Sequence, residues 1–170
     1  MSFEEMIGFW KEARSGLISE VEQIPTEQFG FQATPETRSV AGIVRHVVGA
    51  QEFIIGEICR PDTDFNRVPI RELVERNAAQ AFSGGDKEEL IRSLRSTMES
   101  SEATLRAFGE EALKETVVGL DGKPIPKLSF LSLYISHEMY HRGQISVYER
   151  LMQIEPALTV KFKEFLAANG

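Results

Sequence analysis

The sequence predicts an all-α fold: a four-helix bundle with short extra helices and an irregular loop before the fourth long helix. Over four long segments, apolar residues recur in alternating steps of three and four, the spacing that places them on one face of a helix. Two of these segments begin with the residue spacing of a capping box. No repeat or linker divides the chain, so we expect one domain over residues 1–170.

The first two long helices are delimited by caps and prolines. Ser2 begins a capping box with Glu5, and the apolar stripe that follows ends at Pro25, which disfavours further helix. A connector with several Thr and Gln residues follows. Ser39 is the expected N-cap of the second helix, which ends before Pro61.

The middle of the chain contains a shorter helix and the third long one. The short helix is expected within residues 70–82, ahead of a Gly-rich break. Asp86 begins the second capping box, and Gly109 is the expected C′ residue of the third long helix. Residues 110–126 lose helical periodicity, and their Asp-Gly pair is typical of a turn, so we expect a loop or a small hairpin.

The fourth long helix is expected over residues 128–152, with a short terminal helix over residues 159–168 after Pro156. We expect an antiparallel bundle with one long crossover, in which the second and fourth long helices are neighbours. One side of the fourth helix carries four apolar residues, Leu131, Ile135, Met139 and Ile145.

Composition excludes several classes of function. The chain carries 19 basic and 26 acidic side chains, a net charge of -7, which argues against nucleic acid or an anionic membrane as a partner. The one cysteine, Cys59, cannot form an intramolecular disulfide. The first residues are acidic and amphipathic, unlike a secretory signal, and no apolar run reaches the length of a membrane span. We therefore expect a cytoplasmic protein.

Three histidines carry the strongest chemical signal. His137 and His141 are four residues apart in the fourth helix, so their imidazoles lie on one face and can bind one divalent metal ion. His46 can supply a third nitrogen if its helix is a neighbour, which leaves a position open for water or substrate. The alternative is chance spacing, because a helical histidine is more often a surface residue or a hydrogen-bonded core residue.

The segment His137-Glu138-Met139-Tyr140-His141-Arg142-Gly143-Gln144-Ile145 resembles the fourth-helix signature HxxxHRGQ of the DinB-like superfamily of metal-binding four-helix bundles. The Leu120–Pro124 loop and the Ser39–His46 segment are also similar to that family. The resemblance implies that His46, His137 and His141 bind a divalent metal, commonly zinc or nickel. It further implies a homodimer.

The resemblance leaves two classes of function open. Some relatives are thiol-dependent transferases or isomerases that use a low-molecular-weight thiol such as bacillithiol or mycothiol, and others are assigned as metal-dependent hydrolases. The expected function is therefore that of a metal-dependent enzyme that acts on a small molecule. The alternative is a non-catalytic metal-binding bundle, related to stress, whose ion is structural or whose site has lost activity.

No catalytic residue is identified by the sequence, but three residues near the pair are candidates. Gln144 lies on the ligand face and can orient a histidine or a water, or form a hydrogen bond between helices. Arg142 can hold an anionic substrate group, although a structural ion pair is more common at such a position. Tyr134, like Tyr148, can form the wall of a pocket or pack in the core.

Two further sequence patterns bear on the expected metal site. By letter, residues 137–141 match the H-E-x-x-H motif of zinc proteases, but Glu138 lies on another helical face and no sheet precedes the helix. A protease is therefore disfavoured. Cys59 lies on a different side of its helix from His46, which favours a buried apolar thiol over a fourth ligand.

Overall fold

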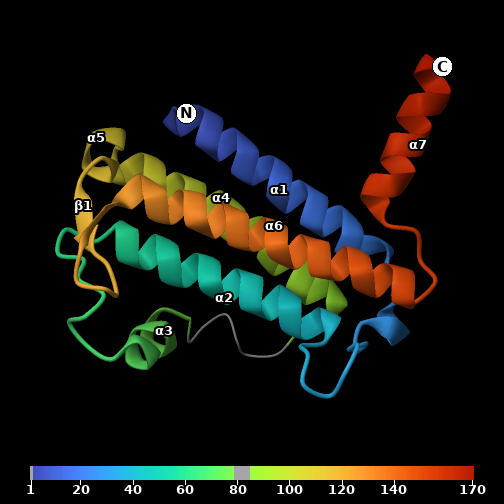
Figure 1. Ribbon diagram of the computed structural model, residues 1–170, viewed down its shortest axis with the longest axis horizontal. Helices are drawn as coiled ribbons and strands as arrows, with labels where there is room; N and C mark the ends of the chain where they lie inside the picture. The colour runs from blue at the N-terminus through green and yellow to red at the C-terminus, as the bar shows by residue number, and fades with distance from the viewer. Residues whose placement is uncertain (1, 79–84) are drawn as a thin grey trace.

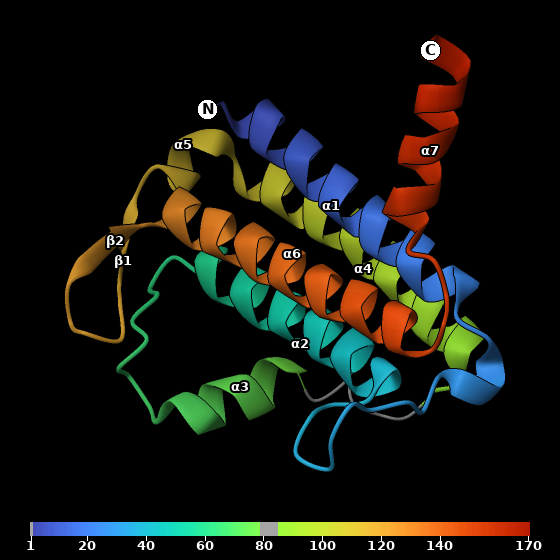
Figure 2. The ribbon, with the colours of Figure 1, turned by 45° about the vertical axis from the view of Figure 1, so that its right-hand side comes forward.

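The computed structural model describes residues 2–78 and 85–170 and contains four long helices that pack side by side (Figures 1 and 2). Helix α6 packs against α1 and α2, and α4 packs against the same two helices from the other side. The predicted four-helix bundle is confirmed. Within the described part of the chain, no helix combines the length and the apolar character needed to cross a membrane. The four helices are α1 (Phe3–Gln23), α2 (Val40–Ile58), α4 (Lys87–Phe108) and α6 (Lys127–Leu151).

The helix directions differ in part from the expected antiparallel arrangement. Following the colours in Figure 1, α2 runs antiparallel to its neighbour α6, whereas α1 and α6 run parallel, as do α2 and α4. Two parallel neighbours that follow each other in the chain require a connection along the bundle. The segment between α2 and α4, which carries α3 (Ile70–Ala78), is this long crossover, as predicted.

The shorter elements lie at the two ends of the bundle. At one end, α5 (Glu110–Leu113), which the sequence did not predict, is followed by a hairpin of β1 (Thr116–Val118) and β2 (Pro124–Pro126). At the other end lie the 3-10 turn η1 (Thr26–Gln28) and α7 (Ala157–Asn169). The hairpin was one of the two alternatives expected for this segment. Residues 79–82 of the predicted short helix lie outside the described residues.

The helix starts follow the predicted caps. The Ser2 hydroxyl accepts a hydrogen bond from the Glu5 amide at 3.2 Å, and Asp86 accepts one from the Glu89 amide at 2.8 Å, each within a complete capping box. The Ser39 hydroxyl accepts from the Gly42 amide at 3.1 Å. These caps satisfy amides that have no partner within their own helix.

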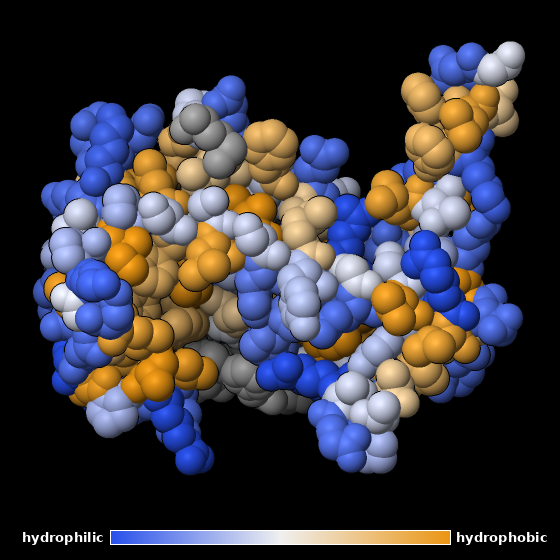
Figure 3. Space-filling model, in the orientation of Figure 1, coloured by the Kyte–Doolittle hydropathy of each residue, from blue (hydrophilic) through white to orange (hydrophobic). Residues whose placement is uncertain are grey.

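Helix α7 begins two residues earlier than predicted because a distant side chain caps it. The Glu20 carboxylate of α1 accepts hydrogen bonds from the amides of Ala157 (2.5 Å) and Leu158 (3.3 Å). Beyond this anchor, α7 projects away from the bundle, and orange apolar residues are visible along it in Figure 3.

A buried polar layer lies between the two larger of the three apolar clusters in the described part of the chain. At its centre, Arg14 Nε donates to Glu138 Oε1 at 2.5 Å, and neither side chain has more than 2% of its surface exposed. The guanidinium also donates to Gln51 Oε1 (2.6 Å) and to the Leu94 carbonyl (2.6 Å), while Trp10 Nε1 donates to Glu138 Oε2 (3.0 Å). The layer therefore joins all four long helices.

The prediction of which side of α6 is buried was partly wrong. Met139 was placed on one apolar side with Leu131 and Ile145, but 47% of its surface is exposed, whereas Glu138 is fully buried. A periodicity of apolar residues cannot reveal that a carboxylate is buried when its partner lies 124 residues away.

We predict that Glu138→Ala lowers the free energy of unfolding by about 3–5 kcal/mol, because it leaves the Arg14 charge buried without its partner. Urea unfolding followed by circular dichroism measures this change. The matched control is Glu99→Ala on the exposed side of α4, which should change stability by less than about 0.5 kcal/mol. An equal loss in both variants would contradict the prediction.

Candidate metal centre

The structure brings the three histidines together from two antiparallel helices. His46 extends from α2, and His137 and His141 extend from α6. The Nε2 atom of His137 lies 3.0 Å from His46 Nε2 and 3.0 Å from His141 Nε2. Two nitrogens bound to one zinc ion at a tetrahedral angle are about 3.4 Å apart. A small outward movement of the rings would therefore admit a cation.

Burial keeps the three imidazoles uncharged at neutral pH. Loss of solvent, followed by the charge of Arg38 and of the other rings, lowers the pKa of His46 to about 4. Burial is also the main cause that lowers the pKa of His137 to about 4 and that of His141 below its usual value. A neutral imidazole has a free lone pair, which is the form that binds a metal.

The three facing Nε2 atoms of His46, His137 and His141 carry too few protons to hydrogen-bond one another at both contacts. His141 Nδ1 lies 2.6 Å from the amide oxygen of Gln144, which only accepts, so this nitrogen carries the proton and Nε2 holds a lone pair. One proton on His137 Nε2 can serve only one of its two neighbours. His137 Nδ1 is buried without a partner among the described residues. A cation would satisfy all three converging lone pairs, so the residues fit a metal.

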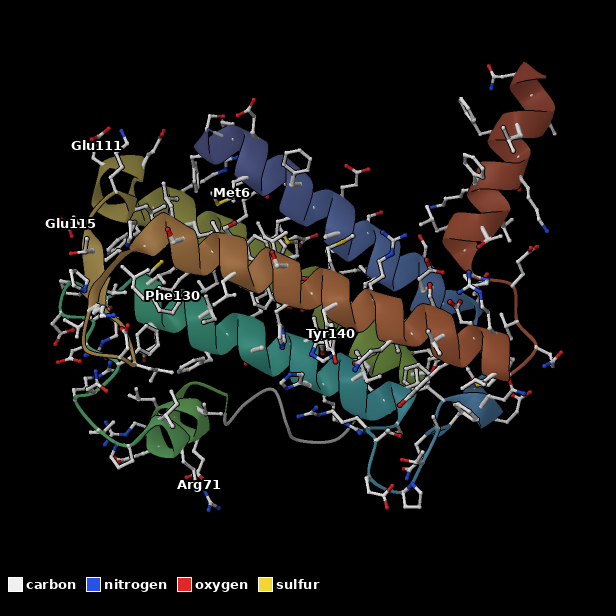
Figure 4. All side chains as sticks on the ribbon, viewed as in Figure 1. Met6, Arg71, Glu111, Glu115, Phe130 and Tyr140 are labelled. Carbon is white, nitrogen blue, oxygen red and sulfur yellow. The ribbon has the colours of Figure 1, made fainter. Side chains whose placement is uncertain are left out.

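Tyr140 is a neighbour of the site that the sequence analysis missed. Its ring centre lies 5.2 Å from that of His141, and its hydroxyl accepts a hydrogen bond from Gln144 Nε2 at 3.2 Å. Figure 4 shows Tyr140 on α6, on the side toward α2. The i, i+4 spacing to Gln144 was a signal that could have found it. Gln144 is thus held from both ends, by His141 and by Tyr140.

Arg142 and Tyr134, the other two candidate site residues, have structural roles. Arg142 forms an ion pair with Glu20 at 3.2 Å, and its guanidinium crosses Gly16, where a Cβ would lie 2.2 Å from Arg142 Cζ. Tyr134 is buried, and its hydroxyl donates to the Val47 carbonyl at 3.1 Å. Tyr134 nevertheless contributes its ring to a small cavity beside His137.

This cavity has a volume of about 180 Å³ and an almost entirely apolar wall. It adjoins one side of the histidine cluster between α2 and α6. Its lining residues are Ala50, Phe53, Ile54, Leu133, Tyr134 and His137.

The zinc-protease pattern does not match the geometry. The Glu138 carboxylate points into the polar layer, where Arg14 and Trp10 hold it, and so it cannot take a proton at the histidines. Cys59 ends α2 as its C-cap, and burial raises the pKa of its thiol to about 11. The described residues that form the possible metal cluster are the three histidines alone.

Comparison with known proteins settles the family. The sequence profile of the DinB superfamily matches residues 10–145. The chain belongs to the DinB superfamily. A search of curated proteins found no match.

Solved structures share the fold of this DinB-superfamily chain at low sequence identity. YjoA, a DinB-like protein of Bacillus subtilis, has a TM-score of 0.67 and 18% identity over 88% of this chain and 92% of its own. YfiT of B. subtilis, described as a probable metal-dependent hydrolase with an unusual four-helix bundle topology, has a TM-score of 0.67 and 18% identity over 91% of each chain. A mycothiol-dependent maleylpyruvate isomerase has a TM-score of 0.67 and 15% identity over 85% of this chain and 61% of its own.

In the metal-free protein, we predict that His46 and His137 stay neutral at pH 6 and titrate near pH 4. Because burial disfavours the charged form, the folded state binds these protons less tightly than the unfolded state, and stability falls as the pH drops below about 6.5. Nitrogen-15 NMR resolves the three histidines and their tautomers. A titration midpoint near 6.5 for either residue would contradict the prediction.

Proposed function

We propose that this chain is a metal-dependent enzyme that acts on a small molecule, with His46, His137 and His141 as the ligands of one divalent ion. The observation that carries the proposal is the convergence of three uncharged imidazole nitrogens on one point between α2 and α6. Three protein ligands leave a coordination position open, as in catalytic metal sites. Zinc or nickel suits such a set of nitrogens.

A divalent cation at this position lowers the pKa of a thiol or a water and so supplies a nucleophile at neutral pH. The chain's own residues position and surround this chemistry. Gln144 fixes the tautomer and the ring orientation of His141. The apolar pocket beside His137 gives one side of the site a hydrocarbon wall.

The neighbours in fold support two classes of reaction within this proposal, and the resemblance of the sequence to thiol-dependent transferases adds a third. One neighbour in fold is named as an isomerase that depends on mycothiol, and another as a probable metal-dependent hydrolase. We therefore propose a thiol transferase, an isomerase or a hydrolase, with a low-molecular-weight thiol as the cosubstrate of the first two.

We predict about one divalent metal per chain in protein purified without a histidine tag, measured by elemental analysis. His137→Ala should abolish binding, because Nε2 of this residue lies between the other two. The control is Ser136→Ala, an exposed neighbour on the same helix, which should retain the metal. A metal-free wild type that stays metal-free after incubation with zinc or nickel would refute the proposal.

Activity separates the enzyme from a non-catalytic metal-binding bundle. Electrophiles are screened with bacillithiol, mycothiol and glutathione, and esters and amides are screened without a thiol. Turnover that is lost on chelation and in His137→Ala supports the enzyme. A loaded protein without turnover in any of these assays would favour the binding role instead.

The proposal includes one domain over residues 1–170 and a cytoplasmic location. The two larger apolar clusters are built from the same four long helices, which supports a single domain. Cys59 is a free thiol, and no disulfide stabilises the fold.

We also propose a homodimer in which α7 of each copy packs on the partner. Leu158, Phe162, Phe165 and Leu166 form one stripe on α7, each with more than half of its surface exposed. A groove between α1 and α6 includes exposed Phe9 and Met139 and has a volume of about 280 Å³. With roughly 100 Å² from each such side chain, a two-fold dimer would bury about 1,200 Å², which suffices for a stable interface.

We predict a mass of twice 19.1 kDa by size exclusion with light scattering. Phe162→Asp should give a monomer, because it places a charge in the apolar stripe. The control Ala167→Asp adds the same charge to the opposite face of α7 and should leave the dimer intact. A monomeric wild type would refute this part of the proposal without affecting the metal site.

A further inference from the structure

Arg38 is an exposed cation at the edge of the histidine cluster, and it forms no ion pair within residues 2–78 and 85–170. It lies in the connector before α2, directly ahead of the N-cap Ser39. No carboxylate of the described residues lies within ion-pair distance of its guanidinium, and its side chain donates no hydrogen bond to them. It lines a polar cavity of about 430 Å³ together with Glu36, Thr37, Ile43, Gln144 and Tyr148.

The connector holds Arg38 in place by its backbone. The Tyr148 hydroxyl of α6 donates to the Arg38 carbonyl at 3.0 Å, and the Tyr148 ring packs edge-on against Phe31 at 5.4 Å. The start of the Arg38 side chain lies over Gly42, where a Cβ would be 3.4 Å from Arg38 Cβ. The side chain is therefore anchored at its base and free at its charged end.

Gln144 links the polar cavity to the histidines. Gln144, which lines it, also accepts the hydrogen bond of His141 Nδ1. The positive charge of Arg38 reaches all three rings and contributes to the lowered pKa of each. A ligand in this cavity would therefore lie beside the histidine cluster.

Chemical character changes along the line where α2 and α6 pack together. Ile43 and Gln144 line the polar cavity, the histidines follow, and Ala50 and Leu133 line the apolar cavity on the other side. Seven helical residues separate Ile43 from Ala50, which corresponds to about 10 Å. A cation, a nitrogen cluster and an apolar pocket therefore follow one another along these two helices.

We propose that Arg38 binds a carboxylate of the small molecule that this centre acts on, while the cavity lined by Phe53 and Leu133 takes its hydrocarbon end. The proposal rests on the proposed function, since the reacting group must lie between these two ends. Guanidinium and carboxylate match in shape and form paired charge-assisted hydrogen bonds. Glu36 faces the same cavity and weakens the attraction for an anion.

The test uses zinc-loaded full-length protein and isothermal titration calorimetry with 4-phenylbutanoate and its uncharged analogue 4-phenylbutanamide. We expect the acid to bind about tenfold more tightly than the amide. Arg38→Gln should remove this preference, Arg38→Lys should retain part of it, and Glu36→Gln should strengthen binding of the acid about twofold. The control is Arg92→Gln, an exposed arginine on α4, which should bind as wild type does.

A preference for the acid that survives in Arg38→Gln would overturn the proposal, because the metal alone would then hold the carboxylate. Equal binding of acid and amide by wild type would overturn it as well. Either result would leave the metal content of the protein unchanged. Failure of the proposed function would instead appear as a loss of metal, which elemental analysis of the same samples detects. Glutathione is titrated in parallel, because the carboxylate that Arg38 binds could be part of a thiol cosubstrate. If it is, Arg38→Gln should weaken glutathione binding about tenfold; if it is not, glutathione should bind this variant as it binds wild type.

Discussion

The buried ion pair between Arg14 and Glu138 is the interaction that orients the bundle. A buried ion pair is tolerated only when hydrogen bonds satisfy both of its charges. Here Trp10 of α1 donates to the Glu138 carboxylate of α6, while Gln51 of α2 and the Leu94 carbonyl of α4 accept from the Arg14 guanidinium. Each helix can therefore adopt only one rotation about its axis that satisfies the layer. Since Glu138 faces this layer, the preceding residue, His137, lies about 100° around α6 and faces α2. The network between the two larger apolar clusters thus also points the histidines toward each other.

The histidine cluster extends this polar layer along α2 and α6, but its chemistry is the opposite. The layer is fully satisfied by its own donors and acceptors, whereas the three imidazoles converge with too few protons to satisfy one another. Burial and the nearby Arg38 keep them uncharged. One set of buried polar groups is closed and stabilises the fold, and the other is open to a ligand. The structural group, Glu138, and the ligand candidate, His137, are therefore consecutive residues that lie on different faces of α6.

Most of the fold could be predicted from local patterns, and the exceptions have physical causes. Caps at Ser2, Ser39 and Asp86 act within one turn, so their residues alone identify them. The buried side of α6 was partly wrong, because apolar spacing suggested Met139 and gave no sign of Glu138. Helix α5 is a single turn, too short to show periodicity.

By itself, the sequence determined the long helices and the facing pair His137 and His141, because helical geometry relates residues within a few positions. Only the tertiary structure decided which long-range partners meet. His46 joins the pair across 91 residues, and Glu20 caps α7 across 137 residues. Arg38 reaches the same site through a connector that Tyr148 holds against α6. Such contacts depend on the order and direction of the helices, which the spacing of residues along one helix does not contain.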